Sequence, residues 1–232
     1  MYPTLPPLNM SDRLYDLAKD GQVQALRSRL SAGTDVNEAD RDGWTALHVA
    51  GLNGRKEVLD LLLAHNPDLD RRNTEGDTAL HMACFNNHVH CVEKILQAGA
   101  DAGVRDVSGV TPLHLADSGE VVQLLMDHGA VLSVRNEEGQ TPLHLVCRLN
   151  RLSAVQVMLG HHADINARDV EGHTPLMYAV TGGSGRGDRL PLVKLLCQHQ
   201  ADVSVENNAG KDVLCLSEEK GTPQIVGFLK GM

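Results

Sequence analysis

Apolar residues in this chain recur in pairs of short runs with helical spacing, and polar turns separate the runs. The apolar positions of one such pair are Leu113, Leu115, Ala116, Val121, Val122, Leu124 and Leu125. Thr111 can cap the first helix, and Pro112 suits its first position because proline has no amide proton to leave unpaired there. The second run ends at Gly129, where a left-handed helix cap needs no Cβ atom. The pattern predicts a helix, a turn, a second helix and a further turn.

A four-residue phrase opens the first helix of each pair and recurs along the chain. Its copies begin at positions 45, 78, 111, 141 and 174, so the steps between them are 33, 33, 30 and 33 residues, and a glycine precedes each copy by two positions. The copies are Thr45-Ala46-Leu47-His48, Thr78-Ala79-Leu80-His81, Thr111-Pro112-Leu113-His114, Thr141-Pro142-Leu143-His144 and Thr174-Pro175-Leu176-Met177. Such a period predicts a stack of repeated units rather than a globule with one core.

The full pattern D-x-x-G-x-T-P-L-H-x-A, followed by a V-x-x-L-L helix and G-A-D, resembles the ankyrin repeat. Residues 106–117 and 169–179 carry it most fully, and the resemblance covers roughly residues 12–230. It implies an all-α fold, an α-solenoid whose units have two antiparallel helices and a short β-hairpin finger between neighbours. It also implies a concave face of inner helices and fingertips, which in this family usually binds another protein.

We expect an extended tail over residues 1–10 and one domain over residues 11–232, built of about seven units. The two outermost units are degenerate and are interpreted as caps, because nothing packs beyond the ends of a stack. The expected boundaries are a cap at 11–39, units at 40–72, 73–105, 106–135, 136–168 and 169–206, and a C-terminal cap at 207–232. Unit 106–135 is three residues short, which predicts the loss of about one turn from its inner helix. Residues 181–189 form a glycine-rich insertion that we expect to be a flexible loop.

Composition and charge narrow the classes of function. The formal net charge is −9, which disfavours binding to nucleic-acid phosphates. No stretch approaches the roughly 18 apolar residues of a membrane span, and the first ten residues lack the apolar core of a signal peptide. The five cysteines are scattered rather than paired in C-x-x-C motifs, which favours buried thiols in a reducing compartment. We expect a cytoplasmic or nuclear protein.

Residues with catalytic or metal-binding chemistry are present, but their spacing points to structural roles. His48, His81, His114 and His144 share one position of the repeat, and the resemblance implies that they link neighbouring turns by hydrogen bonds. A rival interpretation is a zinc site formed by Cys84, His88, His90 and Cys91, although tetrahedral zinc requires four convergent ligands. No Ser-His-Asp arrangement is recognisable. We therefore expect a monomeric protein that is not an enzyme and has no cofactor, metal or small-molecule substrate.

The resemblance also indicates which residues would contact a partner. Candidates at the fingertips and at the ends of the inner helices are Arg41, Asp42, Trp44, Leu52, Asn53, Glu75, Asp77, Phe85, Asn86 and Arg148. Trp44 is the only tryptophan, and we expect it to form an apolar cluster with Leu52 and Phe85, because binding hot spots are enriched in tryptophan. An alternative is that Trp44 covers the junction between the first cap and the first unit.

A second candidate feature is a row of arginines at the last position of four consecutive units: Arg72, Arg105, Arg135 and Arg168. If the fingers stack, these guanidiniums form a basic stripe that could bind carboxylates of a partner in bidentate fashion. The alternative is that they pair with adjacent aspartates such as Asp106 or Asp169. The favoured function is a protein–protein interaction module or adaptor. The other functions considered are a regulatory subunit or inhibitor of an enzyme such as a kinase, and, less favoured, a metalloprotein or enzyme.

Overall fold

The computed structural model describes residues 13–183 and 187–232, and the chain divides into two compact units between Val107 and Ser108. The predicted tail over residues 1–10 and part of the glycine-rich insertion lie outside the described residues. The helices of the first unit are α1 (Leu14–Asp20), α2 (Val23–Ser31), α3 (Ala46–Asn53), α4 (Lys56–Leu63), α5 (Ala79–Phe85) and α6 (Val89–Gln97). The second unit contains the 3₁₀ helix η2 (Pro112–Leu115), α7 (Gly119–Asp127), α8 (Pro142–Arg148), α9 (Leu152–Gly160), α10 (Pro175–Thr181), α11 (Leu190–Gln198), α12 (Val213–Glu219) and α13 (Pro223–Lys230).

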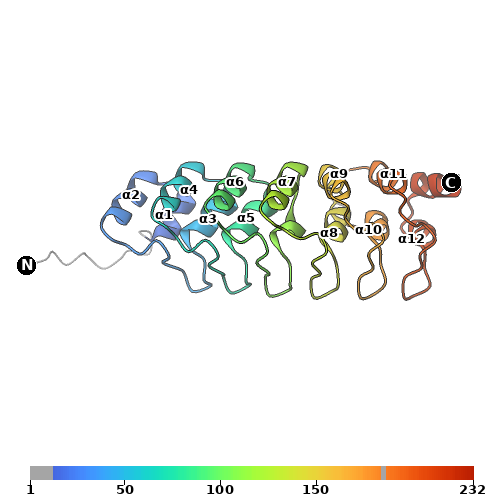
Figure 1. Cartoon of the computed structure of the whole chain (residues 1–232), viewed down its shortest axis with the longest axis horizontal. Helices are drawn as coiled ribbons and strands as arrows, with labels where there is room; N and C mark the ends of the chain where they lie inside the picture. The colour runs from blue at the N-terminus through green and yellow to red at the C-terminus, as the bar shows by residue number, and fades with distance from the viewer. Residues whose placement is uncertain (1–12, 184–186) are drawn as a thin grey trace, which may run out of the picture. The chain divides into compact units, whose positions relative to one another are not determined.

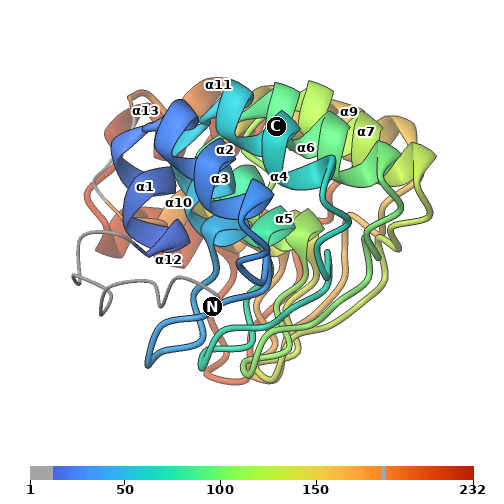
Figure 2. The same cartoon turned by 90° about the vertical axis from the view of Figure 1, so that its left-hand side faces the viewer.

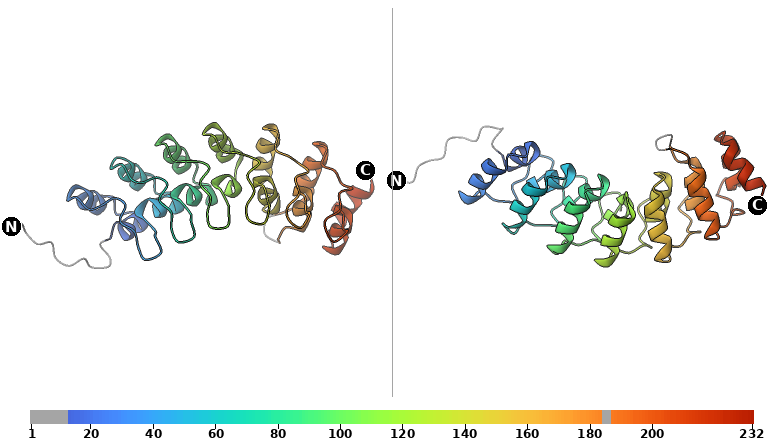
Figure 3. Two further views of the ribbon diagram at one scale, coloured as in Figure 1. Left: turned by 60° about the horizontal axis from the view of Figure 1, so that its bottom comes forward. Right: turned by 90° about the horizontal axis from the view of Figure 1, so that it is seen from above.

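Within each unit the helices pair off in chain order and stack on the next pair (Figure 1, Figure 3). In the first unit, α1, α3 and α5 form an inner row, and α2, α4 and α6 form an outer row. In the second unit, η2, α8, α10 and α12 pack in sequence, and α7, α9, α11 and α13 lie beside them. This helical stack agrees with the fold predicted from the repeat.

The loops between helix pairs project from the same side of the helices in each unit (Figure 2). They are fingers rather than full strands. Among the described residues, the β-pairing that is assigned is one isolated antiparallel bridge, between Ala39 and Thr45. Single backbone hydrogen bonds join adjacent fingers: the Thr74 amide donates to the Asp42 carbonyl (2.9 Å), and the Val170 amide donates to the Glu138 carbonyl (3.1 Å). The fingers therefore form a sparse ladder within each unit.

The glycine two positions before each phrase allows the fingers to approach closely. Gly76 has φ +83°, and a Cβ atom there would lie 2.7 Å from the backbone nitrogen of Val107 in the next finger. Gly43 has φ +79°, and its Cβ would lie 3.0 Å from the Cα of Asn73. Both the left-handed backbone and the contact distance require a residue without a side chain.

The short unit loses a helical turn as predicted. Its inner helix is the single 3₁₀ turn η2, after which the chain leaves in an extended conformation at Ala116. An ion pair between Asp117 and Arg151 occupies this position, with 19% and 12% of the two side chains exposed. Ser118 then caps α7 by accepting a hydrogen bond from the Val121 amide (3.4 Å). A buried pair of charges therefore lies where a longer inner helix would otherwise continue.

Candidate functional site

The repeated histidine links each helix to the next finger. The Nδ1 atom of His48 accepts from the Thr45 amide (3.2 Å) and lies 2.8 Å from the Thr45 hydroxyl, while Nε2 donates to the Asp77 carbonyl (3.0 Å). In the second unit, His114 and His144 donate in the same way to the carbonyls of Gln140 (3.2 Å) and His173 (3.1 Å). This arrangement requires a neutral imidazole with its proton on Nε2.

Burial keeps these imidazoles neutral. His48 is 1% exposed and His144 is fully buried. Desolvation is the largest influence on both groups, and it lowers the pKa of His48 and of His144 below the ordinary histidine value. His48, His114 and His144 therefore act as structural hydrogen-bonding groups, as the resemblance implied.

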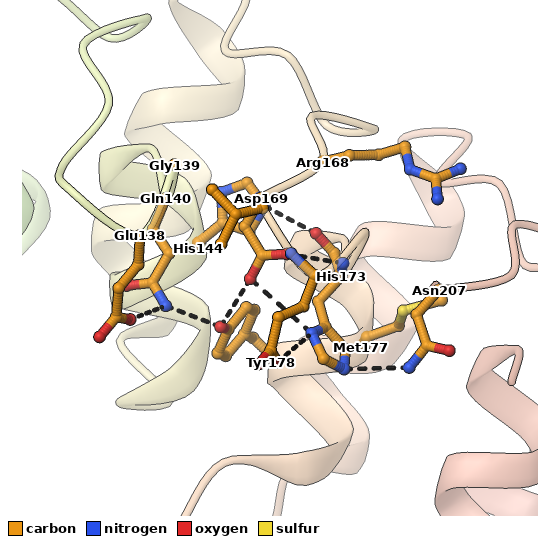
Figure 4. A network of polar contacts seen from close by, with 12 residues as sticks. Glu138, Gly139, Gln140, His144, Arg168, Asp169, His173, Met177, Tyr178 and Asn207 are labelled. Atoms are coloured by element: carbon orange, nitrogen blue, oxygen red, sulfur yellow. Dashed lines mark hydrogen bonds and ion pairs between the residues drawn. The ribbon is translucent and has the colours of Figure 1, made fainter. Parts of the chain in front are cut away.

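The last copy of the phrase has Met177 in place of histidine, and the side chain after it forms a different network (Figure 4). The Tyr178 hydroxyl donates to Asp169 Oδ2 (2.8 Å) and accepts from Gln140 Nε2 (2.7 Å), so it joins two adjacent fingers. Burial, followed by the hydrogen bond to Asp169, raises the pKa of Tyr178 to about 12. Sequence analysis missed this network, although an aromatic residue beside the missing histidine was a visible signal.

Trp44 lies at the base of the first finger, immediately before the N-cap of α3. Its side chain is half-buried, and its ring centroid is 5.8 Å from that of His48. The first finger closes on itself through the Asp40 amide, which donates to the Trp44 carbonyl (2.9 Å). The indole is therefore tilted against the ring of the structural histidine and remains in part accessible to solvent.

The other end of the inner helices presents a second aromatic side chain. Phe85 ends α5 and is 58% exposed. The neighbouring Asn86 donates from Nδ2 to the Leu52 carbonyl at the end of α3 (2.7 Å), so the two helix ends are fixed beside each other. Leu52 is half-buried and Asn53 is exposed. The structure thus brings Leu52 and Phe85 together at one edge of the first unit.

Trp44 does not join that edge. Trp44 precedes α3 and Leu52 lies in its last turn, so the length of the helix separates them by about 12 Å along its axis. The expected cluster of Trp44, Leu52 and Phe85 is therefore corrected to two separate features: the tryptophan at the finger base, and the leucine and phenylalanine at the helix ends.

The fingertip candidates differ in exposure. Arg41, Asp42 and Glu75 are exposed as expected, but Asp77 is only 9% exposed. The Asp77 amide donates to Asn73 Oδ1 (2.9 Å), which turns the residue in toward the base of the finger. Burial, and then the carboxylates of Asp106 and Glu75, raise the pKa of Asp77 to about 6. Asp77 is therefore a poorly hydrated carboxylate at the finger base rather than a tip residue.

The four arginines are exposed, and the side chains of Arg72, Arg135 and Arg168 contact the neighbouring finger. Arg72 donates from Nε to the Gly76 carbonyl (3.1 Å) and from Nη2 to the Arg105 carbonyl (2.8 Å). In the second unit, Arg135 Nη1 lies within hydrogen-bonding distance of the carbonyls of Gly139 (2.7 Å) and Arg168 (2.6 Å). Arg168 Nη2 lies 3.5 Å from Asn208 Oδ1 rather than pairing with Asp169. Arg72 and Arg135 therefore hold neighbouring fingers together instead of forming a free basic stripe.

In the second unit, Arg148 is exposed and the adjacent Leu149 is 40% exposed at the end of α8. A guanidinium that sequence analysis missed fixes this edge: Arg189 donates to the carbonyls of Arg148 (3.0 Å) and Gly183 (2.8 Å). It also donates to the Ala179 carbonyl (3.1 Å). Arg189 thus holds the described part of the 181–189 insertion against α8 and α10.

Two residues of the rival zinc interpretation, His88 and Cys91, contact backbone carbonyls, and Cys84 is buried in the core. Cys84 is fully buried, and burial raises the pKa of its thiol. Cys91 lies 3.9 Å from the Ala50 carbonyl, and His88 Nε2 lies 3.0 Å from the Leu52 carbonyl. Within residues 13–183 and 187–232, no group of three or more histidine, cysteine or acidic side chains is arranged to hold a metal. None of the helices in this part of the chain combines the length and the apolarity needed to cross a bilayer.

The sequence is similar to those of known proteins that contain the same repeat. A family model described as ankyrin repeats in three copies matches residues 14–106, 87–169, 114–207 and 147–231. Serine/threonine-protein kinase 12 of Arabidopsis thaliana is 42% identical over 50 residues, which are 22% of this chain and 11% of that protein. The human Notch-regulated ankyrin repeat-containing protein is 34% identical over 46 residues, which are 20% of this chain and 40% of that protein. The similarity therefore spans less than half of either relative.

The fold has a counterpart among solved structures. The crystal structure of the human ASB11 ankyrin repeat domain matches with a TM-score of 0.76 and a sequence identity of 26%. The match covers 88% of this chain and 90% of that domain. The likeness thus extends over far more of the chain than the short similarities to the kinase and to the Notch-regulated protein.

Proposed function

The chain belongs to the ankyrin-repeat family, and from that premise we propose that it is a non-enzymatic adaptor that binds a partner protein through its fingers and inner helices. Ankyrin repeats are in general protein–protein interaction modules. The first unit offers a surface of this kind between the base of the first two fingers and the ends of α3 and α5. We also propose that the protein works as a monomer in the cytoplasm or nucleus, where its buried thiols Cys84, Cys91 and Cys147 would remain reduced.

The exposure of Phe85 is the observation that carries this proposal. A phenylalanine that is 58% exposed at the end of a helix contributes little to its own core, whereas aromatic side chains at interfaces bury a large apolar area. Asn86 bonds to the Leu52 carbonyl and fixes the backbone beside it. Because this edge is already ordered, a partner loses little conformational entropy on the adaptor side.

Affinity capture from a cell lysate, followed by measurement of the dissociation constant for each captured protein, tests the proposal. We expect Phe85→Ala to weaken binding by at least about tenfold while the helical content is unchanged. Val131→Ala is the matched control, because Val131 is 52% exposed and lies in the other unit. Specific capture of no protein, or equal affinities of the parent and Phe85→Ala, would reject the proposal.

A further inference from the structure

Trp44 and Asp77 occupy the same position in two adjacent fingers, and the imidazole of His48 contacts both residues. The Trp44 ring packs near the His48 ring, with 5.8 Å between centroids, and His48 Nε2 donates to the Asp77 carbonyl (3.0 Å). The two fingers are also joined by the bond from the Thr74 amide to the Asp42 carbonyl (2.9 Å). The indole and the backbone of Asp77 are thus held at neighbouring positions of adjacent fingers.

The Asp77 carboxylate is buried without a cation of its own. Among the ion pairs found in the described part of the chain, none involves Asp77. Arg72 is the nearby candidate, but its Nε and Nη2 donate to the carbonyls of Gly76 and Arg105. The neighbouring carboxylates of Asp106 and Glu75 add further negative potential, and a side-chain hydrogen bond with Asn73, the smallest of these influences, offsets it only in part. A carboxylate that has lost much of its hydration and faces like charges gains more from an incoming cation than one in open water.

The half-buried indole of Trp44 adds a second attraction for the same kind of group. The face of a tryptophan ring attracts ammonium and guanidinium groups, and the attraction strengthens where water is excluded. We propose that Trp44 and Asp77 form a receptor for a cationic side chain, an arginine or a lysine, of the partner protein. This inference rests on the proposed function. The arginine row suggested a partner with carboxylates, whereas this site predicts a partner segment with positive charge.

Fluorescence excited at a wavelength that tyrosine does not absorb provides a direct readout, because Trp44 is the only tryptophan of the chain. The full-length chain is titrated with the capped peptide Gly-Arg-Gly-Arg-Gly and with counterparts containing lysine or citrulline, the last being a neutral analogue of arginine. We expect a saturable change with the arginine peptide, with a dissociation constant on the order of millimolar. The lysine peptide should also bind. The citrulline peptide should bind at least about tenfold more weakly.

Variants separate this site from general attraction to an acidic protein. Asp77→Asn keeps the size of the side chain and should raise the dissociation constant for the arginine peptide by at least about tenfold. Asp77→Glu retains the charge and should recover part of the affinity. Glu137→Gln, at a fingertip of the other unit, removes the same charge and should titrate like the parent. Circular dichroism verifies that each variant is folded.

Two results would overturn the receptor: equal binding of the arginine and citrulline peptides, or an Asp77→Asn variant that titrates like the parent. The proposed function has a separate outcome. If a captured partner still binds Asp77→Asn with the parent's affinity, the adaptor function stands and the cation receptor is rejected. If the arginine peptide binds as expected but no protein is captured, the site stands and the adaptor function is rejected.

Discussion

The Nη1 atom of Arg135 lies 2.6 Å from the backbone carbonyl oxygen of Arg168, one repeat further along the chain. The same nitrogen lies 2.7 Å from the carbonyl of Gly139 in its own finger. Two residues of like charge are therefore connected through the backbone of one and the side chain of the other. Arg72 and Arg105 have the same relationship in the first unit. The side chains of Arg72 and Arg135 therefore hold adjacent fingers in register.

Removal of the Arg135 guanidinium should destabilise the second unit. Arg135→Met keeps most of the side-chain volume but leaves two carbonyls without their donor, so we expect a loss of about 1–2 kcal/mol in the free energy of unfolding. Urea denaturation followed by circular dichroism measures it. Arg148→Met is the control, since Arg148 is exposed at the end of α8, and it should change stability by less than about 0.5 kcal/mol. An equal effect of the two substitutions would argue against the structural role of Arg135.

The link between His144 and the next finger should be worth more, because it is buried. His144→Leu leaves the Thr141 amide and the His173 carbonyl without this partner, and we expect a loss of about 2–4 kcal/mol. Met177 occupies the corresponding position one repeat later, and its apolar side chain cannot donate such a hydrogen bond. Met177→Leu should therefore cost less than about 1.5 kcal/mol. Chemical denaturation of both variants tests the difference, and similar losses would contradict the role assigned to His144.

The fold and the role of the histidines could be predicted because they depend on periodic, local signals. Each phrase combines a helix cap, an apolar face and a left-handed glycine, and one geometry satisfies all three. The ankyrin resemblance and the helical stack are confirmed in this way, and so is the loss of a turn in η2. A deletion of three residues can be read directly from the spacing of the phrases.

The character of the surface could not be predicted with the same success, because it depends on where long side chains point. The repeat position of Asp77 predicts an exposed fingertip, but a bond from its amide to Asn73 turns it inward. Arg72 is exposed, yet its guanidinium donates to backbone carbonyls. Every residue has a backbone carbonyl, so the sequence does not mark which one accepts. Arg189 is the N-cap residue of α11, as Arg55 is of α4 and Arg151 of α9, but the glycine-rich insertion before it shifts it out of the regular spacing. Outside the recurring phrase, the pattern of residue types does not identify which backbone carbonyl a long side chain will reach.

The ion pair in the short unit should be strongly coupled. Arg151→Met alone leaves the Asp117 carboxylate largely buried without this partner, and we expect a loss of about 3 kcal/mol. The double variant Asp117→Leu with Arg151→Met removes both charges and should lie within about 1 kcal/mol of the parent. Urea denaturation of the two single variants and the double variant gives the coupling free energy.

An exposed pair provides the comparison for that cycle. Lys211 Nζ lies 2.6 Å from Glu219 Oε1, but the Lys211 side chain is 42% exposed and the Glu219 side chain is 53% exposed. Lys211→Met should therefore cost no more than about 1 kcal/mol. If the Asp117–Arg151 coupling were as small as this, the pair would be an incidental surface contact and not a replacement for the missing helical turn.

The pKa of Asp77 predicts a pH-dependent contribution to stability with an unusual sign for an aspartate. Its pKa is raised to about 6 in the folded protein, against about 3.9 in an unfolded chain. Between these two values the folded state binds more protons than the unfolded state, so the contribution of Asp77 to stability falls as the pH rises from about 4 to about 6. Partial solvation of the carboxylate keeps the effect smaller than the shift alone implies.

Asp77→Asn removes this titration while the shape of the side chain is kept. We expect the variant to be more stable than the parent at pH 7.5, and the difference to shrink toward zero as the pH falls to about 4. The pKa of His48 is lowered by burial, so both proteins also lose stability as the pH falls below about 6.5, and that loss cancels in the comparison. Urea denaturation of parent and variant at intervals from pH 4 to pH 8 measures the difference. A difference that is independent of pH, or a parent that is the more stable protein at pH 7.5, would show that Asp77 is not a poorly hydrated carboxylate in the folded protein.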